Sequence, residues 1–147
     1  MANACTGTIL AFLTMVLSMH DGFFLPRSSW IPLLSISHRY EFLNVRERAI
    51  REIYGSQGNS VPDPEPPDNL TLILTAEKYD VPPQQAFPPF VELVMRKEPL
   101  TEVEIQRLPA LTVHRLARAR EDYLRERRYF DYVAMRIVCE IWPAGRE

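Results

Sequence analysis

Residues 30–55 read WIPLLSISHRYEFLNVRERAIREIYG, and the apolar side chains in this stretch decide the fold class. In its second half, apolar residues recur every three or four positions: Val45, Ala49, Ile50, Ile53 and Tyr54. This spacing places them on one face of a helix, whereas a half-buried strand would alternate. We expect Asn44 to cap that helix, and Gly55 to end it in the left-handed conformation that glycine adopts without strain.

The first half of the stretch predicts another amphipathic helix. Its apolar face holds residues at the same spacing: Trp30, Leu33, Leu34, Ser37 and Tyr40. Ser29 is the expected N-cap, and Pro32 is tolerated in the first turn, where a missing N–H costs little. Because contiguous apolar surface invites association, we expect this helix pair to form a packing and interaction surface. Its candidate residues are Trp30, Leu33, Leu34 and Tyr40.

Helical signals resume after a loop. Residues 55–67, GSQGNSVPDPEPP, predict a Pro/Gly-rich linker, because proline forbids a continuing helix. Asp68 is the expected cap of the next helix. A further helix is expected to begin near Pro88 or Pro89, since proline is tolerated in the first helical turn.

The last part of the chain carries the longest helical pattern. Thr101 and Glu104 have the spacing of a capping box, which predicts a short helix that ends at Leu108. Helix formers then run from Thr112 to Trp142. The residues expected on one face of that pattern are Val113, Leu116, Ala117, Arg120 and Leu124.

No stretch shows strong strand alternation, so the sequence predicts an all-α fold. We expect short amphipathic helices in an irregular bundle, with a long C-terminal helix and a hydrophobic N-terminal segment. The predicted parts are an N-terminal segment over residues 1–29, a helix pair over 30–54, a linker over 55–67 and a helical extension over 68–147.

Residues that commonly carry chemistry are scattered. His20, His38 and His114 lack the spacing of metal ligands, and Cys5 and Cys139 lie near opposite ends without a CxxC motif. No phosphate-binding loop or nucleophile motif occurs. We therefore expect a protein that is not an enzyme, with no catalytic, cofactor-binding or metal site.

An arginine-rich stretch, residues 115–128, is followed by aromatic residues, a combination that can hold single-stranded nucleic acid. Acidic side chains interrupt it at Glu121, Asp122 and Glu126, and the whole chain has a net charge of −2. Nucleic-acid binding generally requires a basic excess. A solvated, ion-paired helix surface is the preferred interpretation.

The N-terminal residues 8–17, TILAFLTMVL, are apolar and uncharged. They are too few to span a bilayer, which takes about 20 residues, and they lack the basic flank of a signal peptide. They nevertheless support an alternative hypothesis, a small secreted or membrane-associated helical protein. In a secreted chain, Asn69-Leu70-Thr71 would be a glycosylation acceptor.

Several blocks of the sequence together resemble a known family. They are WIPLLSISHRYEF at residues 30–42, VRERAIREI at 45–53, LTAEKYDV at 74–81, PLTE at 99–102 and TVHRLARARE at 112–121. Their order and spacing, over roughly two thirds of the chain, are similar to the C-terminal part of BTB/POZ domain proteins of a form abundant in fungi. The resemblance begins at Trp30, and residues 1–29 lie outside it.

This resemblance implies a protein-interaction module. BTB domains pair with one another or with other proteins; many link targets to cullin-type ubiquitin ligases, and others regulate transcription. We therefore expect a truncated BTB/POZ-type protein of the cytoplasm or nucleus that self-associates or binds a protein partner. A cullin-type scaffold is a further candidate partner, and nucleic acid or a membrane is not favoured.

Overall fold

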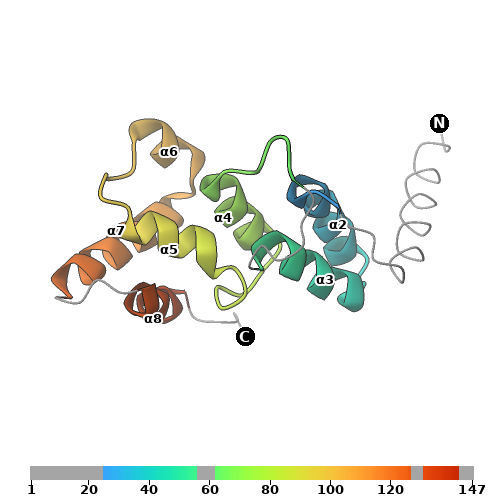
Figure 1. Cartoon of the computed structure of the whole chain (residues 1–147). Helices are drawn as coiled ribbons and strands as arrows, with labels where there is room; N and C mark the ends of the chain where they lie inside the picture. Colours follow the sequence, from blue (N-terminus) through green and yellow to red (C-terminus); the bar gives the residue numbers. More distant parts are fainter. Residues whose placement is uncertain (1–24, 56–61, 127–130, 143–147) are drawn as a thin grey trace. The chain divides into compact units, whose positions relative to one another are not determined.

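The computed structural model of the chain describes residues 25–55, 62–126 and 131–142 (Figure 1). Within these ranges there are seven α-helices and no strand, so the all-α prediction is confirmed. The chain divides into two compact units, Met1–Pro66 and Pro67–Glu147. Most of the predicted N-terminal segment and residues 56–61 of the predicted linker lie outside the described residues.

Helices α2 (Arg27–Arg39) and α3 (Leu43–Tyr54) pack against each other in the first unit. The predicted apolar face of α3 is confirmed, because its residues are all buried: Val45, Ala49, Ile50, Ile53 and Tyr54. The buried residues of α2 are Trp30, Leu33, Leu34 and Ser37. Burial of a large apolar side chain contributes about 1.5–3 kcal/mol, so this shared core stabilises two helices that would be marginal alone.

Both predicted N-caps in the first unit are wrong. Helix α2 begins at Arg27, directly after Pro26, so Ser29 lies inside the helix. Helix α3 begins at Leu43, so Asn44 is already helical. Proline before α2 has a fixed φ that suits the approach to a helix. The start of α3 is set instead by the turn that precedes it, as described below.

A distant residue supplies the cap of α2. The Asp63 carboxylate accepts hydrogen bonds from the Ser28 backbone N–H at 2.7 Å and from the Ser28 hydroxyl at 3.1 Å. These bonds, above all the backbone one, hold the pKa of Asp63 below its ordinary value. An acceptor from 35 residues away thus satisfies an amide that a helix start would otherwise leave unpaired.

Gly55 ends α3 in a different way from the prediction. Its φ of −67° and ψ of 157° are extended, so the expected left-handed conformation is wrong. Its N–H donates to the Arg51 carbonyl oxygen at 2.8 Å. A Cβ at this position would overlap that same oxygen. Glycine is therefore required here by the close approach of two backbone segments and not by its φ angle.

The second unit contains α4 (Asn69–Lys78), α5 (Phe87–Met95), α6 (Glu102–Arg107), α7 (Ala110–Arg125) and α8 (Asp131–Ile141). Helix α5 is central to it, packing against α4, α7 and α8, while α6 stands apart from this group (Figure 1). The Phe90 and Trp142 rings meet edge to face, with centroids 5.1 Å apart. This contact fixes the end of α8 against α5.

Two predicted caps of the second unit are confirmed. Asp68 accepts a hydrogen bond from the Thr71 backbone N–H at 2.9 Å and caps α4. Thr101 and Glu104 form both bonds of the capping box that starts α6. In each case the side chain and its target amide are three residues apart, so local sequence alone specifies the contact.

The long C-terminal pattern is divided between two helices. Helix α7 has 16 residues and is followed by Glu126, whose backbone is extended. The buried residues of α7 are Thr112, Leu116, Ala119 and Tyr123. Of the predicted shared face only Leu116 is buried, while Ala117 and Leu124 are exposed, Leu124 by 60%. A single straight helix would carry the apolar face of α8 away from α5. The break lets Val133, Ala134, Ile137 and Val138 become buried.

Candidate interaction surface

The structure places the four predicted interaction residues in two environments. Trp30, Leu33 and Leu34 are buried, with at most 6% of each side chain exposed. Tyr40, in contrast, is 46% exposed and follows the last residue of α2. Trp30 also has the Arg48 guanidinium 5.7 Å from its ring centroid, a contact between α2 and α3. Tyr40 is therefore the one of the four that solvent reaches.

Tyr40 belongs to a group of exposed apolar side chains at the turn between α2 and α3. Phe42 is 42% exposed and Leu43 is 67% exposed. The Tyr40 and Phe42 ring centroids lie 6.2 Å apart, a contact within the range of paired aromatics. We name Tyr40, Phe42 and Leu43 the turn surface.

The backbone of Glu41 produces this arrangement. Its φ of 58° lies in the left-handed region, which costs a non-glycine residue about 1–2 kcal/mol. The Phe42 N–H then donates to the Ser37 carbonyl oxygen at 2.9 Å, and the Arg46 N–H donates to the Phe42 carbonyl oxygen at 2.9 Å. The turn therefore closes α2 and opens α3 while bringing two aromatic rings together. Strained positions of this kind are concentrated at functional sites.

Charged side chains of both signs lie in the turn or within about one helical turn of it. The Arg39 guanidinium lies 5.6 Å from the Tyr40 ring centroid, a cation–π contact. Glu41 and Glu47 are both exposed. A mixed rim of this kind suits a second protein surface better than it suits a uniformly charged polymer.

Helix α6 also exposes apolar side chains, but they do not form one patch. Val103 is 68% exposed and Ile105 is 44% exposed. These residues are two positions apart on a helix, so they point to nearly opposite sides. The turn surface is therefore the better candidate for a contact with another protein.

Two ion pairs hold α6 in place. Arg96 donates two bonds of 2.8 Å to the Glu104 carboxylate, and this contact lowers the pKa of Glu104 to about 2. Arg107 donates to Asp68 at 2.7 Å and lowers the pKa of that carboxyl to about 2. No residue of α6 itself is buried, so these pairs and the buried Leu108 that follows the helix tie it to the rest of the unit.

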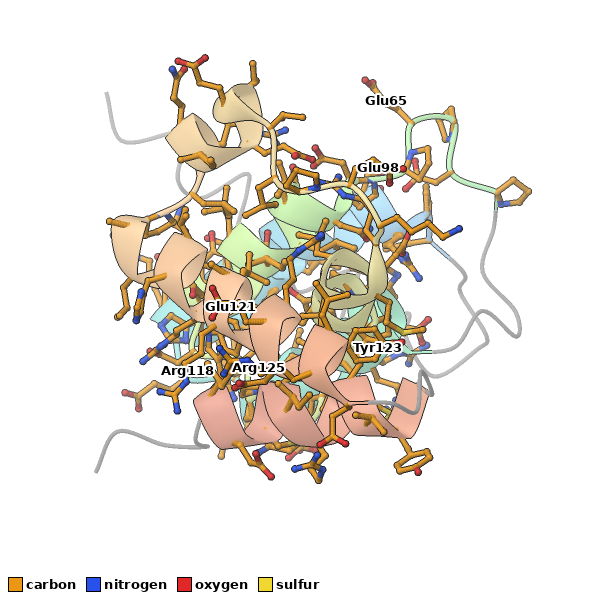
Figure 2. The ribbon with its side chains drawn as sticks, turned by 90° about the vertical axis from the view of Figure 1, so that its left-hand side faces the viewer. Glu65, Glu98, Arg118, Glu121, Tyr123 and Arg125 are labelled. Atoms are coloured by element: carbon orange, nitrogen blue, oxygen red, sulfur yellow. The ribbon has the colours of Figure 1, made fainter. Side chains whose placement is uncertain are left out.

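The arginine-rich stretch is largely engaged within the chain. Arg118 lies 3.8 Å from Asp122, and Arg125 lies 3.6 Å from Glu121 and 3.7 Å from Asp122. Figure 2 shows the side chains of Arg118, Glu121 and Arg125 gathered along α7. Arg120 donates to the carbonyl oxygens of Leu93, Lys97 and Glu98, at and after the end of α5. Arg127 and Arg128 lie outside the described residues.

Among the described residues, those typical of catalysis or metal binding do not gather at one site. In the part of the chain that the structure describes, no group of three or more His, Cys, Asp or Glu residues could hold a metal ion. His38 and His114 are exposed on different helices. Cys139 is a half-buried free thiol whose pKa is raised by burial. His20 and Cys5 fall outside the described residues.

The apolar stretch at residues 8–17 lies outside the described residues as well. Among the helices that the structure describes, none combines the length and the apolar character needed to cross a membrane. Asn69, the formal glycosylation acceptor, is the first residue of α4 and is half-buried.

Comparison with known proteins adds no relative. The chain matches no protein-family model, no curated protein and no solved structure.

Phe42 and Leu43 are surface residues that the helical spacing of the sequence did not identify. The signal that could have identified them is the run Tyr40-Glu41-Phe42-Leu43. In this run, apolar residues continue beyond Tyr40, the last residue of the predicted helical face. A helix that continued through this run would bury some of these side chains. The left-handed Glu41 turns the chain and leaves all three apolar side chains partly in solvent.

Proposed function

We propose that this chain is a non-enzymatic protein–protein interaction module of BTB/POZ type, acting inside the cell. Its contact surface is the turn surface, and its partner is another protein or a second copy of the chain. The observation that carries the proposal is the exposure of Tyr40, Phe42 and Leu43 together on a strained turn.

Energetics support a role for this surface in association. Exposed aromatic side chains supply large contact area, and interface centres are enriched in them. The two helices that carry the turn share a buried core, so the surface is presented on a supported scaffold. A supported surface binds with less loss of conformational entropy than a flexible segment does.

The BTB/POZ part of the proposal rests on the block pattern described above, and two of its blocks can be located on the structure. The block at residues 45–53 coincides with most of α3, and the block at 112–121 lies within α7. Both therefore fall on helices, as the last helices of a BTB domain and a helical extension require.

Sedimentation equilibrium of the purified chain over a wide concentration range tests the proposal. We expect the weight-average mass to rise above that of the monomer as concentration increases. A mass that stays monomeric at the highest concentration, with cooperative thermal unfolding, would contradict self-association.

A further inference from the structure

A shallow groove lies on the second unit. It has a volume of about 530 Å³ and is bounded by the start of α4 and one side of α5. Its lining residues are Asn69, Pro88, Val91, Glu92, Leu93, Met95 and Arg96. The apolar lining residues all belong to α5, and we name them the floor of the groove; we name Asn69, Glu92 and Arg96 its rim.

The floor suits an apolar side chain. Val91 and Met95 are one helical turn apart and each is half-buried, so part of each side chain faces the groove. Methionine is flexible and polarisable, and it adapts to ligands of different shapes. An apolar side chain that covers Val91 and Met95 removes their remaining surface from water, which favours binding.

The charges on the rim favour a cation over an anion. Arg96 is already committed, because its guanidinium donates to both oxygens of Glu104 and to the Pro99 carbonyl oxygen. Glu92 is exposed, and its carboxylate has no hydrogen-bond or ion-pair partner among the described residues. The charged group beside the apolar floor that has no partner among the described residues is therefore the Glu92 carboxylate, which is negative.

We propose that this groove binds a peptide segment of a partner protein, in which an apolar side chain is followed closely by lysine or arginine. The apolar side chain lies over Val91 and Met95, and the cation pairs with Glu92. The Asn69 side-chain amide, which both donates and accepts, is placed to bond a peptide backbone. This inference does not depend on the turn surface or on self-association.

Selection of random displayed peptides on the purified full chain tests this inference. We expect the wild-type chain to enrich peptides that combine apolar residues with Lys or Arg. Selection on Glu92→Lys is expected to lose the basic residues and to gain Asp or Glu. Glu121→Lys, which reverses an exposed carboxylate on α7 outside the groove, is the control and should enrich the wild-type consensus.

The strongest enriched peptide is then measured in solution by fluorescence anisotropy. We expect Glu92→Lys to weaken its binding at least about fivefold, as expected when a surface attraction becomes a repulsion. Val91→Trp, which fills the groove, should weaken binding as well, with thermal melting as the check that it folds.

Three results would overturn the proposal. One is selection that yields no consensus above background, and another is a consensus that is acidic on the wild-type chain. The third is a consensus whose binding is unchanged in both Glu92→Lys and Val91→Trp, because the peptide would then bind elsewhere.

Discussion

Glu104 shows how one carboxylate fixes a local structure. It accepts two bonds from Arg96 and one from the Thr101 backbone N–H, and these contacts lower its pKa from 4.5 to about 2. A lowered folded-state pKa means that the ionised form stabilises the fold. This contribution is fully present above pH 4.5 and is lost as the pH falls toward 2.

We predict that Glu104→Gln lowers the free energy of unfolding by about 1–2 kcal/mol near neutral pH, an ordinary range for a charge-assisted bond partly screened by solvent. Urea denaturation at pH 6 and at pH 3 measures this loss. The difference in the free energy of unfolding between variant and wild type should be smaller at pH 3. Glu102→Gln, an exposed neighbour on the same helix, is the control. An equal loss in both variants would argue against the role of the Arg96 pair.

Trp142 combines a stabilising ring with an unsatisfied donor. Its side chain is 5% exposed, and its Nε1 hydrogen has no acceptor among the described residues. A buried donor without a partner costs about 1–3 kcal/mol. The ring meanwhile contacts Phe90, and the Arg115 guanidinium lies 5.8 Å from its centroid.

We therefore predict that Trp142→Phe changes the free energy of unfolding by less than about 1 kcal/mol, because the lost contacts and the removed donor offset each other. Trp142→Ala should cost about 3–5 kcal/mol, since it leaves a cavity beside Phe90. Thermal melting of both variants measures these two changes in stability. Equal damage in the two would show that the indole N–H does have a partner.

At the scale of helices and their ends, Gly55 gives the sharpest prediction. A Cβ at this position would overlap the Arg51 carbonyl oxygen, so Gly55→Ala must shift the backbone at the end of α3. We expect a loss of about 1–3 kcal/mol in the free energy of unfolding, typical of overpacking. Circular dichroism during urea unfolding measures it. Stability equal to the wild type would contradict the close approach.

The helix ends also show where prediction from sequence succeeds. The caps at Asp68 and Thr101 were predictable because a side chain and an amide three residues away suffice. The cap of α2 was not, because its acceptor, Asp63, is 35 residues distant. The break after α7 depends on the burial of α8 against α5, which a local pattern of helix formers does not encode.

For the whole molecule, the fold class could be predicted and the surface only in part. Spacing predicted the buried faces of α2 and α3, because burial follows from helical periodicity. The same spacing placed Tyr40 on the buried face of α2, although it lies in solvent. The reason is the left-handed conformation of Glu41, which neither its residue type nor its position in the pattern predicts. The groove beside α5 likewise arises from helices brought together by folding.

Two matched leucine variants test most directly whether the turn surface mediates association. Leu43→Glu places a charge on the turn surface, where the native side chain is 67% exposed. Leu124→Glu makes the same change on α7, where the native side chain is 60% exposed.

The measurement is sedimentation equilibrium of both variants beside the wild-type chain. We predict that Leu43→Glu weakens self-association at least about tenfold, because a charge would have to be buried in the contact, while Leu124→Glu leaves it at the wild-type level. Association that is unchanged by Leu43→Glu, or weakened equally by both variants, would contradict the claim.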